Sequence, residues 1–529
     1  MKVSFIYLTS NQNGDEHIGT ASIAAFLEKY NIPVELKIIT YLPDQFNIDN
    51  ILKEIPEGID LIGFPVFNTN ILYVYKICDA IKFRNPNIIT SIGGPLATDA
   101  GNLILKDCSS IDFVVLGDGE IPFLTVIQEI QKGGEINKIP WILTRDNHNL
   151  NEKQINITDV KSIPWVSRQY LKQMLDRGYG TARISAARGC CANCSFCSHN
   201  NYNMGKNKRW RGRDIKDVFN EVVSIHQKYN IMSFTFNDGS FEDPGERGKQ
   251  RIRQFCEMVL NYPHKLHFWC FLRSDTFKEK DIPLIKLMKK SGFTEVFIGI
   301  ESQNADDLRF YNKRATVQDN NNSLQYFQQC GINVLFGFIN FNPISSIESL
   351  KDNYEFLKKV KNWRPHAYVG RLSIYYNTAA HRKCEAMGLL TDDFSYYNAD
   401  GYRFVNNQVA EIWTFIEENL LSSIIFTKYD FDLFYFNNYI HSFLALFPDE
   451  ISVYMVEYKN IMGEIATILS DYFYHLFYQR DLDYAKKKIK CFEKDMEKAI
   501  LKMNSLKLKI MLREPFRSYV KGVQLKNRS

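Results

Sequence analysis

The chain has 529 residues and is 45% hydrophobic, 24% charged and 14% aromatic, a length that predicts about three domains at roughly 150 residues each. This composition excludes an intrinsically disordered, collagen-like or low-complexity protein. Because there is no run of about 18 uncharged apolar residues, we expect no membrane-spanning helix. The first residues, MKVSFIYLTS, are typical of a strand rather than a secretory signal, so we expect a cytoplasmic protein.

The formal net charge of +5 is distributed unevenly. Residues 485–529 hold 14 Lys and Arg against 4 Asp and Glu, and the rest of the chain is net acidic. Such an end can bind an acidic partner, but we favour the solvated face of a terminal helix. We expect neither a membrane nor a nucleic acid among the partners.

Residues 1–140 alternate apolar, strand-like runs with helical patterns. Continuous apolar strands separated by helices indicate a parallel sheet covered on both faces. Five such units predict a flavodoxin-like doubly wound α/β domain, whose ligand lies beyond the carboxyl ends of the strands. The expected strands are residues 3–8, 34–39, 60–64, 88–92 and 113–116, and the expected helices include residues 18–30 and 72–83.

The rest of the chain divides into three parts. Residues 141–178 lack clear periodicity and are interpreted as a linker that can contain a hairpin. Residues 179–390 carry a second series of six βα units, which predicts a partial or full (β/α) barrel with its site at the C-terminal ends of the strands. Residues 391–529 are helical, and their aromatic run 429–447 is expected to be core rather than a substrate cleft. The expected barrel strands are residues 182–186, 233–237, 267–271, 295–300, 334–339 and 367–373.

Four cysteines lie close together in the segment ARGCCANCSFCSHN, directly after the first expected barrel strand. Cys190, Cys194 and Cys197 have the spacing C-x3-C-x2-C, and Cys191 gives an alternative C-x2-C-x2-C register. No Cys/His pair follows at the spacing that would complete a four-coordinate zinc site. A [4Fe–4S] cluster normally takes four cysteines, so three would leave one iron open to a substrate. The scattered cysteines elsewhere are expected to be buried small hydrophobes.

This loop resembles the signature of the radical S-adenosylmethionine (radical SAM) superfamily. Arg188 and Gly189 before the first cysteine and Phe196 before the last also fit that family, which implies that Phe196 lies at the cofactor. The resemblance implies that the three cysteines of the C-x3-C-x2-C register hold a [4Fe–4S] cluster. It also implies that S-adenosylmethionine binds the open iron and is cleaved to methionine and a 5′-deoxyadenosyl radical. The family usually has proline after the first cysteine, where this chain has Cys191, a residue without an assigned role.

Further segments match the same family in order. FNDGSF ends the second expected barrel strand and keeps only Asp238 of an acidic pair that relatives often carry. FWCFLRSD places Arg273 at the end of the third. VFIGIES resembles the motif whose Glu301 and Ser302 lie near the cofactor's ribose and methionyl groups, and Gly337 lies on the strand that flanks the adenine. The resemblance therefore implies cofactor contacts at these five residues.

Residues 1–140 also resemble the cobalamin-binding domain that is often fused ahead of a radical SAM barrel. IGGPLAT and VVLGDGE place glycines after two expected strands, where the backbone can approach a corrin and its nucleotide tail closely. The resemblance implies cobalamin contacts at Gly93, Gly94, Gly117, Gly119 and Glu120. Some fused relatives keep this domain without the corrin, so both alternatives stay open.

The histidines are weaker candidates. Asp15, His17 and Gly19 are one residue short of the D-x-H-x-x-G pattern that supplies an imidazole to cobalt, so we expect His17 to cap or pack at a helix start. His199 can tune the cluster or lie on the loop surface, and we favour the surface. The basic segment NKRWRGRD, residues 207–214, can face the cofactor or substrate carboxylates, but we favour a solvated helix start.

The resemblance implies a methyltransferase acting on an unactivated carbon, or a phosphinate, of a natural product or peptide, with a reductant such as flavodoxin or ferredoxin. Enzymes of the same architecture that dehydrate, rearrange, epimerise or cyclise their substrate are the alternatives, and a cobalamin or redox sensor is the non-enzymatic one. A methylthiotransferase is disfavoured because the N-terminal domain has only Cys78 and Cys108. No catalytic acid or base can be named, and Cys270 and Cys330 are candidate hydrogen donors.

Overall fold

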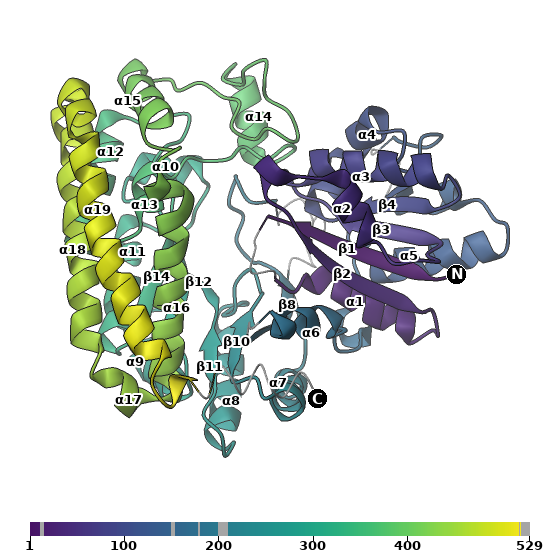
Figure 1. Cartoon of the computed structure of the whole chain (residues 1–529), viewed down its shortest axis with the longest axis horizontal. Helices are drawn as coiled ribbons and strands as arrows, with labels where there is room; N and C mark the ends of the chain where they lie inside the picture. The colour runs from purple at the N-terminus through teal and green to yellow at the C-terminus, as the bar shows by residue number, and fades with distance from the viewer. Residues whose placement is uncertain (11–14, 150–153, 178–179, 199–209, 518, 520–529) are drawn as a thin grey trace.

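The computed structural model describes residues 1–10, 15–149, 154–177, 180–198, 210–517 and 519. The chain forms an N-terminal α/β domain, a middle region of barrel strands and a C-terminal set of long helices (Figure 1). The barrel strands lie between the N-terminal domain on one side and the C-terminal helices on the other (Figure 1). This arrangement confirms the predicted fold class.

The N-terminal domain is an open sheet with helices on both faces. Its strands are β1 (Val3–Thr9), β2 (Val34–Thr40), β3 (Leu61–Pro65), β4 (Ile89–Gly93), β5 (Phe113–Val115) and β6 (Ile142–Leu143), and its helices are α1 (Ile18–Glu28), α2 (Ile48–Lys53), α3 (Ile71–Arg84), α4 (Pro95–Asp107) and α5 (Glu120–Gln131). In the described residues the strand order is β2-β1-β3-β4-β5-β6. Strands β1 to β5 pair in parallel, and β6 pairs antiparallel with β5. Residues of α3 and α4 pack on one face, and residues of α1 and α5 pack on the other. The order of the first five strands confirms a flavodoxin-like fold.

Helix α6 (Gln169–Asp176) covers the free edge of this sheet. Gln169 Oε1 accepts a hydrogen bond from the Leu36 N–H at 2.9 Å, and Gln173 Nε2 donates to the Leu36 carbonyl at 2.7 Å. These side chains satisfy backbone groups that an edge strand otherwise leaves unpaired. A hairpin does follow β6, closed by a bridge between Thr144 and Asn147.

The middle region is a partial barrel of parallel strands with helices outside. Its strands are β7 (Thr181–Ile184), β10 (Ser233–Phe236), β11 (His267–Trp269), β12 (Phe271–Arg273), β13 (Glu295–Glu301) and β14 (Asn333–Phe338), and its helices include α7 (Ile215–Tyr229), α8 (Glu246–Leu260), α9 (Ile282–Lys290), α11 (Val317–Gln329) and α12 (Ile347–Lys359). In the described part of the chain they form sheets of order β11-β10-β7 and β12-β13-β14. The expected third strand is divided at Cys270, because its first half pairs with β10 and its second half with β13.

The expected sixth barrel strand, residues 367–373, is wrong for most of its length. Helix α13 (Pro365–Val369) occupies its first part, and Arg371 makes an isolated bridge to Phe341. Proline has no N–H for a strand ladder, and its fixed φ suits the first turn of a helix. The apolar residues that suggested a strand, Tyr368 and Val369, are buried in the core shared with the C-terminal helices.

A loop that follows α14 (Ala379–Ala386) fastens the barrel to the N-terminal domain. Tyr396 of this loop is 4% exposed and belongs to the core between β3, α3 and α4. Its hydroxyl contacts the Tyr75 hydroxyl at 2.6 Å and donates to the Asp107 carboxylate, and the Asn68 amide donates to its carbonyl. These contacts therefore hold the N-terminal domain in a fixed position relative to the barrel.

The C-terminal region contains α15 (Asn407–Asn419), α16 (Asp430–Leu446), α17 (Pro448–Ser452), α18 (Met455–Tyr474) and α19 (Leu482–Met511). The aromatic run falls on α16, where Phe436 and Phe443 are buried, which confirms that it is helical core. Helix α19 buries one face, including Phe492 and Met496, so the basic end is largely a solvated helix face as favoured; residues 520–529 lie outside the described residues. Within the described residues, we find no helix with the length and apolar character of a membrane span.

Candidate functional site

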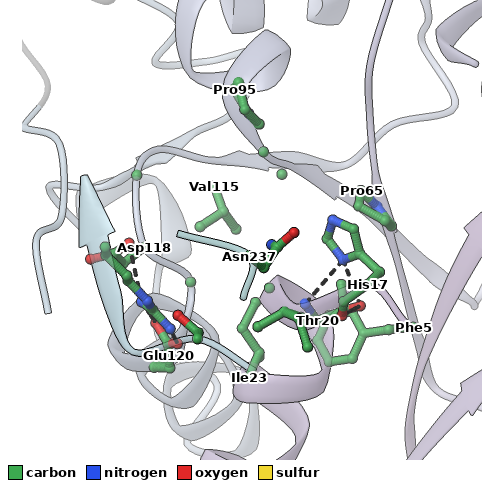
Figure 2. Close-up of a pocket in the computed structure, with 18 of the residues that line it drawn as sticks. Phe5, His17, Thr20, Ile23, Pro65, Pro95, Val115, Asp118, Glu120 and Asn237 are labelled. Atoms are coloured by element: carbon green, nitrogen blue, oxygen red, sulfur yellow. Dashed lines mark hydrogen bonds and ion pairs between the residues drawn. The ribbon is translucent and has the colours of Figure 1, made fainter. Parts of the chain in front are cut away.

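A cavity of about 250 Å³, partly open to solvent, lies where the carboxyl ends of the N-terminal strands meet the barrel. The N-terminal domain contributes loops after β3, β4 and β5 and the start of α1. The barrel side contributes Ser185 after β7, and Asn237 and Gly239 after β10. Figure 2 shows Asn237 among N-terminal side chains such as His17 and Val115. Both folds place their ligands at these strand ends, so the cavity lies where the ligand sites of the two domains meet.

The glycines that the sequence singled out, Gly93, Gly94, Gly117 and Gly119, all line this cavity. Gly94 has φ +108° and Gly117 has φ +83°, in the left-handed region that favours glycine. A Cβ at Gly117 would lie 2.3 Å from the Asn156 carbonyl oxygen. Side chains are thus excluded where the backbone forms the wall, which is the geometry expected for a large ring bound by backbone contact.

His17 caps helix α1 and lines the cavity. Its Nδ1 accepts a hydrogen bond from the Thr20 N–H at 3.2 Å, and its ring lies 5.1 Å from that of Tyr7. Burial, assisted by the positive charge of Arg183, lowers the pKa of His17 to about 4. The predicted capping role is therefore confirmed, and the ring is neutral at physiological pH.

The cysteine loop, residues 190–198, follows β8 (Ala187–Gly189), which pairs with β9 (Trp210–Gly212). Ser195, 2% exposed, anchors its middle. The Ser195 N–H donates to the Tyr311 carbonyl at 2.7 Å, and its Oγ donates to the carbonyl of Phe310, the last residue of α10 (Ala305–Phe310), at 2.8 Å. Phe196 packs edge-on against the Tyr311 ring at 5.6 Å. Its visible role is to anchor the loop, and a cofactor contact stays a prediction.

The loop cysteines form no disulfide and are of intermediate burial. Burial, followed by the negative charge of Asp243, raises the pKa of Cys190 to about 12. Burial also raises the pKa of Cys194, although the ammonium of Lys313 opposes this. In the part of the chain that the structure describes, no three His, Cys, Asp or Glu side chains are gathered in a group able to hold a metal ion. The loop carries the right donors, but their sulfurs do not converge on one point.

Buried acidic residues lie beside this loop. Asp238 is buried, and its Oδ1 accepts the N–H groups of Ala186 and Ala187 at 2.8 and 2.9 Å. Burial raises its pKa to about 7. Of the acidic pair that relatives often carry, the segment FNDGSF keeps only Asp238, but Glu242 and Asp243 follow it along the chain, and both are fully buried.

Glu242 and Asp243 connect the predicted residue Arg273 with the cysteine loop. The Arg273 guanidinium pairs with the Asp243 carboxylate, and the Arg273 N–H donates to Glu242 Oε1 at 2.9 Å. The other oxygen of Asp243 accepts the Cys191 N–H at 2.6 Å. The sequence did not predict this pair, because its context, SFEDPG, matches none of the family segments. The presence of two acidic residues soon after a barrel strand was the sequence feature that could have indicated this pair.

Glu301 and Gly337 line a second cavity of about 370 Å³ beside β14. The Glu301 carboxylate pairs with Lys313 Nζ at 2.8 Å, and a Cβ at Gly337 would lie 2.8 Å from Glu301 Oε2. Glu301 has φ +68°, a strained conformation for a residue with a side chain and one that concentrates at functional sites. Ser302, by contrast, is fully buried and donates to Asp307 Oδ2 at 2.8 Å, so its hydroxyl stabilises the following loop.

Other candidates are not brought to these cavities. Cys270 is buried in the outer barrel core, and Cys330 packs against that core as the C-cap of α11. His199 lies outside the described residues. The prediction that the basic segment 207–214 is a solvated helix start is wrong for Arg211. This residue lines the first cavity and pairs with Asp118. A basic side chain shortly before a helix gave no indication of this pairing.

Comparisons with known proteins agree with this geometry. The family model of the B12 binding domain matches residues 9–127. An uncharacterized methyltransferase, PH0819 of Pyrococcus horikoshii, is 27% identical over 348 residues, which cover 65% of this chain and 73% of that protein. The anaerobic magnesium-protoporphyrin IX monomethyl ester cyclase of Synechocystis sp. is 24% identical over 295 residues, which cover 55% of this chain and 57% of the cyclase.

The fold is similar to that of a solved radical enzyme. The cobalamin-dependent S-adenosylmethionine radical enzyme OxsB with aqua-cobalamin bound superposes with a TM-score of 0.70 at 17% identity, covering 98% of this chain and 83% of that one. Its structure with both aqua-cobalamin and S-adenosylmethionine bound gives a TM-score of 0.68 at 18% identity, covering 99% and 83%. The chain therefore contains a B12-binding domain and has the fold of the cobalamin-dependent S-adenosylmethionine radical enzymes.

Proposed function

We propose that this protein is a cobalamin-dependent radical SAM methyltransferase acting on an unactivated carbon of a small molecule or peptide. The observation that carries the proposal is the shared cavity, in which the glycine-lined loops of a B12-binding domain face the barrel beside a C-x3-C-x2-C loop.

The donor set of the cysteine loop fits an iron–sulfur cluster. Cys190, Cys194 and Cys197 form no disulfide and lie within one anchored loop. Buried thiols with raised pKa values hold their protons at neutral pH, so metal binding must displace those protons and draw the sulfurs together. With three thiolates, one iron keeps an open position for S-adenosylmethionine.

The walls of the first cavity fit a corrin. Gly93, Gly94, Gly117 and Gly119 present backbone rather than side chains, and His17 is committed to capping α1. We therefore propose that cobalamin binds without a ligand from His17. S-adenosylmethionine is proposed to contact Arg273, Glu301 and Gly337, which approach the barrel interior at the ends of three neighbouring strands.

Bound together, the cluster and S-adenosylmethionine supply a primary carbon radical, and the corrin supplies a methyl group. The chain's own residues hold the target and exclude water. The Tyr396 loop keeps the N-terminal domain over the barrel mouth, and enclosure of this kind prevents a reactive radical from escaping. A flavodoxin- or ferredoxin-like protein is proposed as the electron donor.

A second candidate function is a radical reaction without methyl transfer. The similarity to the magnesium-protoporphyrin cyclase favours it, because that relative is named for ring formation. The two candidates would use the same cluster, corrin and S-adenosylmethionine residues. The fate of the methyl group of S-adenosylmethionine therefore distinguishes them.

The test is anaerobic reconstitution of the full chain with iron, sulfide and hydroxocobalamin, followed by a strong reductant and S-adenosylmethionine carrying a labelled methyl group. We expect an iron–sulfur absorbance, bound corrin, release of 5′-deoxyadenosine and transfer of label to the bound corrin. Release of 5′-deoxyadenosine without label transfer would favour the second candidate. Zinc or no metal at the cysteines, with no 5′-deoxyadenosine, would contradict both.

A further inference from the structure

A buried charged network connects the corrin-facing loop of the N-terminal domain to the start of the cysteine loop. Arg188, two residues before Cys190, donates to Glu120 Oε2 at 3.2 Å and pairs with Asp118 Oδ1 at 3.1 Å. Its other nitrogen binds Glu120 Oε1 and donates to Ser22 Oγ at 2.9 Å. Both oxygens of Glu120, which is 1% exposed, are therefore committed to protein partners.

A second arginine strengthens this connection. Arg211 lies opposite Arg188 in the β8–β9 hairpin, binds the second oxygen of Asp118, and donates to the Thr158 carbonyl at 2.7 Å. Two like charges facing each other across a hairpin repel. The carboxylates of Asp118 and Glu120 offset that repulsion by pairing with the two arginines, and we call these four side chains the clamp. Figure 2 shows Asp118 and Glu120 at one side of the cavity.

Burial makes these ion pairs sensitive to the loss of any one partner. Burial alone lowers the pKa of Arg188, but the carboxylates of Glu120 and Asp118 raise it above its ordinary value, so the guanidinium stays charged. Removal of one partner from a buried pair leaves an uncompensated charge, which costs far more than an exposed ion pair contributes. The loop with Asp118 and Glu120 and the hairpin with Arg188 therefore move together.

The wall between the cavity and the first cysteine is only backbone thick. Gly189 lines the cavity and connects Arg188 to Cys190 with φ +85°. Opposite it, a Cβ at Gly239 would lie 3.3 Å from the Gly189 oxygen and 3.5 Å from Cys190 Cβ. A shift of Arg188 is thus transmitted to Cys190 without an intervening side chain.

We propose that Arg188 and Glu120 are positioning residues that fix the separation and orientation between the corrin and the iron–sulfur cluster. The inference rests on the proposed function, because it presumes that both groups bind where the cavity and the loop place them. Working geometry in such sites is held to within about 0.5 Å by surrounding contacts. Arg188 acts through Gly189 and Cys190, not by touching the substrate.

The chain offers a matched control for a general loss of domain contact. Arg168 likewise lies between two carboxylates, at 2.9 Å from Glu16 and 2.8 Å from Glu221, and joins the N-terminal domain to α7 of the barrel. Its side chain is 9% exposed, against 22% for Arg188. Unlike Arg188, it does not line the cavity, and it is distant from Cys190 along the chain. Loss of Arg168 should destabilise the domain interface without changing how the two cofactors face each other.

The experiment compares Arg188→Gln, Glu120→Gln and Arg168→Gln in the full chain, reconstituted with cluster and cobalamin. Iron content and hydroxocobalamin affinity are measured first. Electron paramagnetic resonance then records the spin–spin interaction between cob(II)alamin and the reduced cluster in partly reduced samples. We expect Arg188→Gln and Glu120→Gln to bind both the cluster and cobalamin but to show a weakened or heterogeneous spin–spin interaction. Arg168→Gln should retain the wild-type interaction, and Arg188→Lys should restore part of it.

Three results would overturn the assignment. One is an unchanged spin–spin interaction in Glu120→Gln. This variant removes the charge from the N-terminal side and leaves the sequence of the cysteine loop intact, so it provides the test even if Arg188→Gln fails to fold. The second is an equal change in Arg168→Gln. The third is no interaction in the wild type loaded with both groups. A wild type that holds no corrin or no cluster would instead contradict the proposed function itself.

Discussion

The cavity and the cysteine loop bind their proposed cofactors in opposite ways. The cavity is already built: Gly94 and Gly117 have the backbone conformations that keep its wall free of side chains, and His17 is fixed as a helix cap. The cysteine loop is anchored through Ser195, but within the described residues its sulfurs are not gathered. A corrin bound by shape needs a finished wall, whereas a cluster forms strong bonds of its own and can draw its ligands together.

Cys194→Ala is expected to affect the two regions most differently, with a large loss of bound iron and no loss of corrin affinity. Because three thiolates are the minimum for the cluster, bound iron should fall from a full complement to nearly none. The cavity lining does not include Cys194, so hydroxocobalamin affinity should stay unchanged. Iron analysis and optical titration measure the two quantities on the same sample.

Cys191→Ala is the matched control for that change. Cys191 is held through its backbone N–H by Asp243, which the substitution leaves in place, so iron should be retained. If Cys191→Ala lost its iron and Cys194→Ala kept it, the assignment of the cluster ligands would be wrong.

Gly117→Ala is expected to do the opposite of Cys194→Ala, lowering corrin affinity and leaving bound iron unchanged, with a smaller effect. The added methyl group would lie 2.3 Å from the Asn156 oxygen at φ +83°, so the loop must shift into the cavity. Hydroxocobalamin affinity should fall by about tenfold or more, equivalent to roughly 1.4 kcal/mol, and iron content should be unchanged. Optical titration of the corrin gives the affinity.

Gly133→Ala separates backbone strain from the effect on the cavity. Gly133 also has a positive φ, +71°, but a Cβ added there would have no neighbouring atom within 4 Å among the described residues. We expect a small loss of thermal stability and an unaltered affinity. Equal losses of affinity in both variants would contradict a preformed corrin wall.

An effect confined to acidic pH is expected from His17→Asn, in which asparagine can still cap α1. Because the folded pKa of His17 is lowered to about 4, the unfolded chain binds the extra proton first as pH falls. Stability that this histidine contributes is therefore complete above its unfolded pKa and is lost as pH falls from about 6.5 towards 4. The variant should show a shallower loss of stability between pH 7 and 5, by up to about 1.4 kcal/mol per pH unit.

Calorimetric or fluorescence melting curves at several pH values test this. His267 and His441, whose pKa values burial also lowers, remain in both proteins and cancel in the comparison. Identical pH slopes in the two proteins would show that His17 is accessible to protons when folded.

The sequence alone determined the order of the domains, most strands and the cysteine spacing. These features are local: a continuous apolar run between turns specifies a buried parallel strand wherever the chain goes, and the loop thiols lie within a few residues of one another. The same holds for Gly94 and Gly117, because the positive φ at these two positions strongly favours glycine.

The tertiary structure alone decided which charges meet. Arg188 and Glu120 are 68 residues apart, and Arg273 meets Asp243 across 30. The sequence marked Arg188, Arg273 and Glu120 only through the family resemblance and gave no sign of these ion pairs, because each partner is chosen by how distant segments of the chain pack together. The sixth barrel position became α13 for a similar reason: packing against the C-terminal helices buries Tyr368 and Val369 as well as a strand would. Local pattern fixes the elements, and long-range burial selects the contacts between them.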